Sequence, residues 1–192
     1  MKKRDFSGMD QREILLAAKK ACLNMLERSD KTEMQLRMKL AEAGFPSSAV
    51  DGAIAYAASF HYVDDVRFTM NYLRTGLKKK SRRRVEAELL QKGIDRETLE
   101  RCLEEMGDHE QCQEKTALDL IIKRTAGKDW EDAAVRRRVM QYLAGQGFSY
   151  EIIRGAAAQY QQRLEENGQE PSQESGNGDG NWNGYRKFVH KS

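Results

Sequence analysis

The sequence predicts an all-α protein, an elongated, curved tandem array of three three-helix modules with about nine helices. An apolar skeleton occurs three times, around Gly44, Gly93 and Gly147, and the intervals between these glycines define the repeat. Within each copy, apolar residues four apart lie on one helical stripe, and Gly followed by Phe or Ile is typical of a helix end. A unit this small buries its apolar face mainly by stacking on neighbours, which favours an array.

The skeleton residues are Leu36, Leu40, Phe45, Val50 and Ile54 in the first copy, Val85, Leu89, Ile94, Leu99 and Leu103 in the second, and Val139, Leu143, Phe148, Ile153 and Ala157 in the third.

The first module is expected over residues 10–59, after a mobile lead-in at residues 1–9. Its helices are expected at about residues 10–28, 32–44 and 47–57. Thr32 and Glu33 suit the start of the second helix, and Pro46 suits the first turn of the third.

The second module is expected over residues 60–107, with helices at about residues 64–76, 81–93 and 95–106. Asp64, Ser81 and Asp95 are the expected N-caps, because their side chains accept hydrogen bonds from free N–H groups of the first turn. Asp65 follows in a first turn, where the helix dipole favours a carboxylate.

The third module is expected over residues 108–166, with helices at about residues 108–127, 129–147 and 149–166. Residues 167–192 are rich in Gly, Asn, Ser, Gln and Glu, so we expect a disordered tail. Its end, from Trp182 to Phe188, mixes aromatic and basic residues and reads either as a docking motif or as an ordinary terminus.

Composition predicts a soluble, cytoplasmic, non-enzymatic protein. The chain has 192 residues, 39% hydrophobic and 33% charged, with no apolar span long enough for a membrane helix and no secretory signal. Three cysteines without C-x-x-C spacing favour reduced thiols. Phosphate-loop, dinucleotide, zinc-protease and nucleophile-elbow motifs are missing, so no catalytic residue, metal site or cofactor is predicted. The methionines are expected to fill the core.

Two basic clusters are the strongest local signal in a chain whose net charge is only +3. Residues 78–84 read KKKSRRR, and Arg136–Arg138 follow Arg82–Arg84 by the same interval that separates Gly147 from Gly93. Arginines in a first turn oppose the helix dipole, so stability alone does not favour them there. Guanidinium groups bind phosphate or carboxylate bidentately, which suits a binding face. The alternative is a solvated surface paired with Glu86, Glu88 or the acidic stretch 95–114.

Four stretches carry a family resemblance. Arg28-Ser29 is followed by EMQLRMKL at 33–40 and by Gly44-Phe45; residues 62–68 read YVDDVRF, residues 88–94 ELLQKGI and residues 142–149 YLAGQGFS. In order and spacing they resemble the bacterial RecX family, modulators of the RecA recombinase, over about residues 18–164. His61 stands where the family usually has Gly, module three is the least regular, and the tail lies outside the resemblance.

The resemblance implies a protein that binds along the groove of a RecA filament on DNA and inhibits either its assembly or its ATP hydrolysis and strand exchange. We expect it to be a monomer. The alternatives are direct DNA binding by helix-turn-helix-like modules, and a helical scaffold for another protein. Binding to RecA or DNA is expected at Arg37, Lys39, Arg67, Lys78, Lys79, Lys80, Arg82, Arg83, Arg84, Arg136, Arg137 and Arg138.

Overall fold

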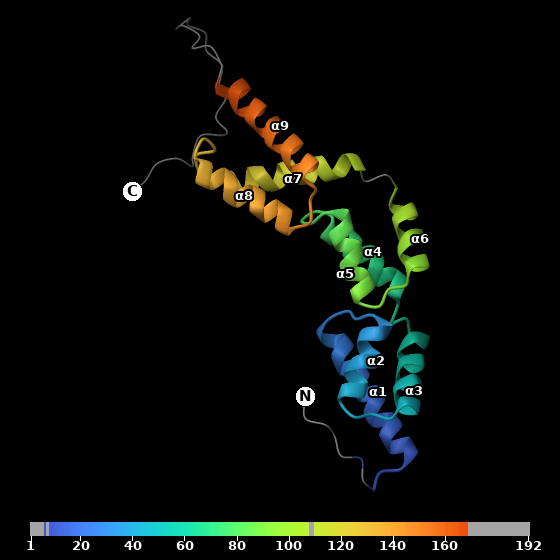
Figure 1. The fold of residues 1–192 in the computed structure, drawn as a ribbon. Coiled ribbons are helices and arrows are strands. Elements are labelled where there is room, and N and C mark those ends of the chain that lie inside the picture. Colours follow the sequence, from blue (N-terminus) through green and yellow to red (C-terminus); the bar gives the residue numbers. More distant parts are fainter. Residues whose placement is uncertain (1–5, 7, 108–109, 169–192) are drawn as a thin grey trace, which may run out of the picture.

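The computed structural model describes residues 6, 8–107 and 110–168, which form nine α-helices and no strand (Figure 1). The helices are α1 Gln11–Arg28, α2 Glu33–Glu42, α3 Ser47–Ser59, α4 Asp65–Gly76, α5 Arg82–Gln91, α6 Arg96–Met106, α7 Glu110–Thr125, α8 Ala133–Gly145 and α9 Tyr150–Gly168. The predicted all-α class is confirmed. No helix in these ranges is both long and apolar enough to cross a membrane. Of the expected tail, 167–192, the first two residues belong to α9, and residues 169–192, like most of the lead-in, lie outside the described residues.

Most predicted helix starts are confirmed by their caps. Thr32 Oγ1 accepts from Gln35 N at 3.2 Å and Ser81 Oγ from Arg84 N at 3.2 Å. Asp64 and Asp95 cap α4 and α6 in the same way, with N–H to carboxylate distances of 2.8 Å each. These polar residues therefore fix where α2, α4, α5 and α6 begin.

The predicted start of α8 is wrong. Asp129 does not cap this helix; it accepts from Glu131 N at 2.9 Å in a short turn, and Asp132 is the N-cap instead. Between them Trp130 is buried, with its ring perpendicular to that of Tyr160 on α9 at a centroid distance of 5.0 Å. Burying this indole on α9 holds the chain out of the helix until Ala133.

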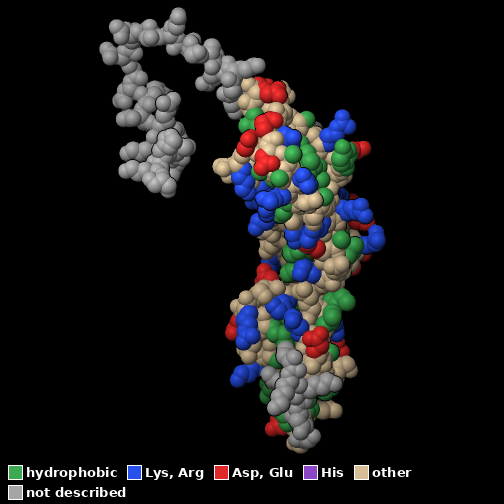
Figure 2. Space-filling model, turned by 60° about the vertical axis from the view of Figure 1, so that its left-hand side comes forward, with side chains coloured by type: hydrophobic (Ala, Val, Ile, Leu, Met, Phe, Trp, Pro, Cys, Tyr) green, Lys and Arg blue, Asp and Glu red, His purple; other side chains and the backbone are tan. Residues whose placement is uncertain are grey.

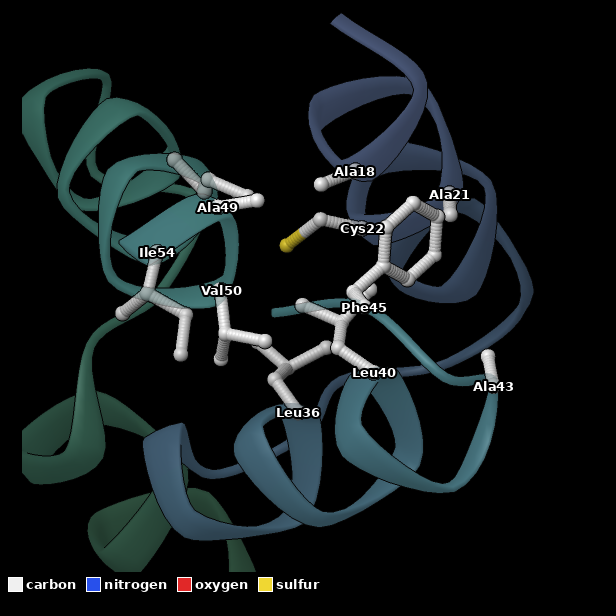
Figure 3. Packing of buried hydrophobic residues seen from close by; sticks show 12 residues of the cluster. Ala18, Ala21, Cys22, Leu36, Leu40, Ala43, Phe45, Ala49, Val50 and Ile54 are labelled. Atoms are coloured by element: carbon white, nitrogen blue, oxygen red, sulfur yellow. The ribbon is translucent and has the colours of Figure 1, made fainter. Parts of the chain in front are cut away.

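Each module has its own hydrophobic core, and all fifteen skeleton residues are buried. The first and third helices of each module pack together, as α1 on α3, α4 on α6 and α7 on α9. Figure 3 shows the first core, where Leu36 and Leu40 of α2 face Val50 of α3 and Cys22 of α1. The expectation for the methionines is wrong in part, because Met34, Met38 and Met140 are exposed.

The junctions between modules are built from equivalent residues. Thr32 Oγ1 donates to Lys92 O at 2.5 Å, and Ser81 N donates to Gln146 O at 3.0 Å. Ser81 follows Thr32 by the interval from Gly44 to Gly93, and Gln146 follows Lys92 by the interval from Gly93 to Gly147, so both pairs obey the repeat. In both junctions the start of a middle helix therefore meets the glycine turn of the next module.

A second contact supports each junction. The first N–H of α2, that of Glu33, donates to Asp65 at 3.0 Å, and the first N–H of α5, that of Arg82, donates to Gln113 at 3.2 Å. Asp65 and Gln113 lie on α4 and α7, the first helices of the following modules. The same docking used twice gives the elongated, bent body of Figure 1. The module limits 10–59, 60–107 and 108–166 stay predictions.

Candidate cationic binding surface

Arg82, Arg83 and Arg84 occupy the first turn of α5, as the sequence predicts, because Ser81 caps the helix. Two of them are engaged inside the protein. Arg82 Nε lies 2.7 Å from Glu86, and Arg84 Nε lies 3.1 Å from Glu88. Arg82 and Arg84 therefore form the ion pairs within the protein that the sequence offered as the alternative to a binding face.

Arg84 also belongs to the junction with module three. Its Nη1 donates to the carbonyl oxygen of Gly145, near the end of α8. Its Cβ lies close to Gly147, since a Cβ built on that glycine would be 2.9 Å away. Arg84 is thus positioned to hold α5 against the α8–α9 turn.

Glu88 is the anchor of this paired group. It accepts from Lys80 Nζ at 2.6 Å, from the Tyr72 hydroxyl at 2.6 Å and from Arg84. Burial raises the pKa of Glu88, but the three hydrogen bonds outweigh it and lower the pKa to about 2. Burial, with the bond to Glu88, raises the pKa of Tyr72 to about 12.

Arg83 differs from its two neighbours. Its side chain is exposed and has no hydrogen-bond or ion-pair partner among the described residues. Lys78 and Lys79 lie in the turn before α5. Both are exposed, and neither side chain has a partner among the described residues. These three cations keep their full capacity to bind an external anion.

The second triplet lies deeper in its helix than the first. Because α8 begins at Ala133, Arg136–Arg138 fall in its second turn and avoid the unfavourable end of the dipole. Arg136 donates to Trp130 O at 3.3 Å and lies 3.5 Å from Glu131. Arg137 and Arg138 are exposed and unpaired in the part of the chain that the structure describes. Arg137 is the repeat equivalent of Arg83, so an unpaired arginine is presented in two successive modules.

Module one contributes less than expected. Arg37 lies 2.5 Å from Asp51 and 2.9 Å from Glu33, and hydrogen bonds to these carboxylates raise its pKa. Lys39 of module one is exposed, and so is Arg67 of α4 in module two; neither side chain has a partner among the described residues.

The structure thus divides the twelve expected residues in two. The paired ones are Arg37, Lys80, Arg82, Arg84 and Arg136; those without a partner in the described ranges are Lys39, Arg67, Lys78, Lys79, Arg83, Arg137 and Arg138. Figure 2 shows Lys and Arg side chains gathered across the middle of one face of the body. This surface can bind phosphates or carboxylates along its length, without an enclosed pocket.

Sequence reasoning missed an apolar hollow between α8 and α9. It has a volume of about 330 Å³ and is lined by residues that include Met140, Ala144, Tyr150 and Ile153. In module one the equivalent position to Met140 is Arg37, whose ion pair with Asp51 joins α2 to α3. The signal was Met140, which helical periodicity places beside the stripe of Val139 and Leu143, together with Tyr150 at the start of the next helix; both side chains are exposed.

Comparison with known protein families agrees with this architecture. Residues 18–56, 64–103 and 113–156 match the models of the first, second and third three-helix domains of RecX, which together span more than half of the chain. The chain belongs to the RecX family. Its three modules are therefore RecX three-helix domains.

Individual relatives are distant but consistently named. The regulatory protein RecX of Caldanaerobacter subterraneus is 30% identical over 140 residues, covering 72% of this chain and 68% of the relative. That of Vibrio parahaemolyticus is 28% identical, covering 72% and 88%. That of Clostridium acetobutylicum is 24% identical, and the chain spans 66% of its length.

Solved structures show the same fold. The crystal structure of RecX from Lactobacillus salivarius aligns with a TM-score of 0.59 at 20% identity, covering 79% of this chain and 99% of the other. A second crystal structure of a regulatory protein RecX aligns with a TM-score of 0.59 over 79% and 77% of the two chains.

Proposed function

We propose that this RecX-family protein is a cytoplasmic, non-enzymatic regulator that binds as a monomer along the groove of a RecA filament on DNA. It inhibits DNA-dependent ATP hydrolysis and strand exchange by occupying that groove. Family membership and the relatives' name, regulatory protein, support a regulatory role.

The observation that carries the binding mode is the pair of unpaired arginines, Arg83 and Arg137, at equivalent positions of modules two and three. A helical filament also repeats its surface, so equivalent groups on successive modules meet equivalent groups on successive protomers. Contacts that are weak one by one then act together, because the first raises the effective concentration of the second.

The test compares unpaired with paired arginines. Arg83→Ala/Arg137→Ala should raise the concentration needed for half-inhibition of DNA-dependent ATP hydrolysis by RecA about tenfold, since about 1.4 kcal/mol of binding free energy corresponds to tenfold. Arg82→Ala/Arg136→Ala removes the same charge from the same triplets and should change it by less than about threefold, because these groups are already satisfied internally.

Equal effects of the two double variants, at matched thermal stability, would contradict the assignment of the unpaired arginines. Co-sedimentation with RecA filaments tests the partner itself. A protein that stays in the supernatant at micromolar concentrations is not a filament binder.

A second candidate function is direct binding to duplex DNA through the same cations. It predicts tight binding to naked duplex with a steep dependence on salt, because each neutralised phosphate releases counterions. Filament binding without affinity for naked duplex excludes it as the main activity.

A further inference from the structure

Three aromatic side chains lie in series where α3 leads into α4: Tyr56 on α3, and Phe60 and Tyr62 in the turn after it. The ring centroids of Tyr56 and Phe60 are 5.1 Å apart, and those of Phe60 and Tyr62 are 5.9 Å apart with their planes at 21°. Phe60 is 54% exposed and Tyr62 53% exposed, and neither belongs to a hydrophobic core. Large exposed aromatic rings held side by side are typical of binding sites.

The backbone holds these rings in place at some cost. His61, between Phe60 and Tyr62, has a φ of +56°, the one positive φ of a residue other than glycine in the described ranges. The turn is fixed by hydrogen bonds from His61 N to Ala58 O at 2.9 Å and from Tyr62 N to Ala57 O at 3.0 Å. The rings of Phe60 and Tyr62 are thus presented by a fixed turn and not by a freely moving loop.

One cation contacts the ring series, and another follows Tyr62 by five residues in the chain. Lys19 of α1 places its Nζ 4.3 Å from the centre of the Tyr56 ring. Arg67, in the first turn of α4, is exposed, and its side chain is unpaired within the described part. Asp64 and Asp65, which lie between Tyr62 and Arg67 in the chain, both accept backbone N–H groups, Asp64 from Arg67 and Asp65 from Glu33.

This combination selects the ligand chemistry. A nucleobase stacks on an aromatic face whatever its identity, while the phosphate beside it is attracted to a nearby cation. In a duplex the base faces are covered by their neighbours, so only a single strand presents them.

We propose that Tyr56, Phe60 and Tyr62, with Lys19 and Arg67, form a stacking platform for consecutive bases of single-stranded nucleic acid. This site shares Arg67 with the cationic surface but is otherwise built from residues outside it, and it needs no RecA to bind its ligand.

The test measures fluorescence anisotropy of a labelled oligothymidylate and of an abasic oligonucleotide of the same length. Phe60→Ala/Tyr62→Ala should weaken binding to oligothymidylate at least about tenfold, because two base-stacking contacts are lost, and binding to the abasic strand less than about twofold. Tyr150→Ala is the matched control, since it removes a ring that is 76% exposed on another module, and should change neither affinity. Phe60→Tyr/Tyr62→Phe keeps both rings and should bind as the wild type does.

Unchanged affinity of Phe60→Ala/Tyr62→Ala for oligothymidylate overturns the proposal, and so does a wild type that does not distinguish oligothymidylate from the abasic strand. If that variant keeps its affinity for oligothymidylate but no longer co-sediments with RecA filaments, the rings contact protein, and the proposal is again wrong. Because the assay contains no RecA, its outcome is independent of the regulatory function proposed above.

Discussion

Glu88 shows how one carboxylate makes a cluster of cations compatible with a folded helix start. Lys80 and Arg84 both carry positive charge close to the beginning of α5, where the dipole opposes them. Glu88 lies one turn or more into the helix, binds both, and takes a third hydrogen bond from Tyr72. The same group indirectly holds Arg84 where it reaches Gly145 of module three.

This network predicts a dependence of stability on pH. The pKa of Glu88 is lowered from its ordinary 4.5 to about 2 in the folded protein, so its contribution is fully present above pH 4.5 and is lost as the pH falls toward 2. Between pH 5 and 2 the free energy of unfolding of the wild type should fall about 2 kcal/mol further than that of Glu88→Gln. Urea unfolding at several pH values measures this. Glu104→Gln, at an exposed position, should follow the wild type, and a parallel profile for Glu88→Gln would contradict the role of the network.

His61 carries backbone strain that a glycine would not. A side chain at φ +56° costs about 1 kcal/mol relative to glycine, so His61→Gly should raise the free energy of unfolding by about that amount. Ala58→Gly, nearby on α3 with an ordinary helical backbone, should lower it by about 1 kcal/mol. Thermal unfolding of both variants decides the matter. A loss of stability in His61→Gly would mean that the imidazole makes a contribution larger than the strain.

At the scale of elements, the array is held by short polar junctions between modules and not by one continuous core. In each junction a middle helix begins against the glycine turn of the next module, and that turn has little room for a side chain. A Cβ on Gly147 would lie 2.6 Å from Ser81 Oγ, whereas a Cβ on Gly127 would have no neighbour within 4 Å. Both glycines have positive φ, of 88° and 71°.

Substitutions of these two glycines distinguish the cost of backbone strain from the cost of disturbing the junction between modules. Gly127→Ala should cost only the left-handed conformation, about 1 kcal/mol, whereas Gly147→Ala should cost about 1 to 3 kcal/mol more, because the methyl group pushes α5 away from the turn. Hydrogen exchange should show the extra loss at the start of α5 and the end of α8. Equal destabilisation by both substitutions would mean that the junction does not depend on close approach at Gly147.

A feature of the fold could be predicted from the sequence when it depends on residues close together in the chain. The skeleton residues and the caps Thr32, Asp64, Ser81 and Asp95 follow from spacing within one helix, and these predictions are confirmed. The start of α8 was not predictable in this way, since Asp129 and Asp132 are both good caps and the choice depends on Trp130 reaching Tyr160 on another helix.

The candidate site was predictable only as a set of charges. The sequence places three arginines together at the start of α5, but which of them stay free depends on partners one turn along the helix and on a distant carbonyl, that of Gly145. The exposed Met34 likewise depends on a distant glycine, since a Cβ on Gly93 would meet its side chain. Repeat offsets relate equivalent residues but do not reveal such contacts.

For the whole molecule, the central question is whether modules two and three bind one filament at the same time. If they do, their binding constants multiply, and weakening either contact weakens the whole complex by the same factor. If each module binds independently, the other still binds when one is weakened, and the overall affinity changes by no more than about twofold, because one of two equivalent sites is lost.

The single variants Arg83→Ala and Arg137→Ala distinguish these cases. With simultaneous binding, each should raise the half-inhibitory concentration for RecA ATP hydrolysis about threefold, and the double variant should show the product, about tenfold, since the two sites share no partner. With independent binding, each single variant stays within about twofold of the wild type, and only the double variant shows a large loss. The pattern expected for independent binding would contradict the proposal that one molecule bridges successive protomers, even if both arginines contact the filament.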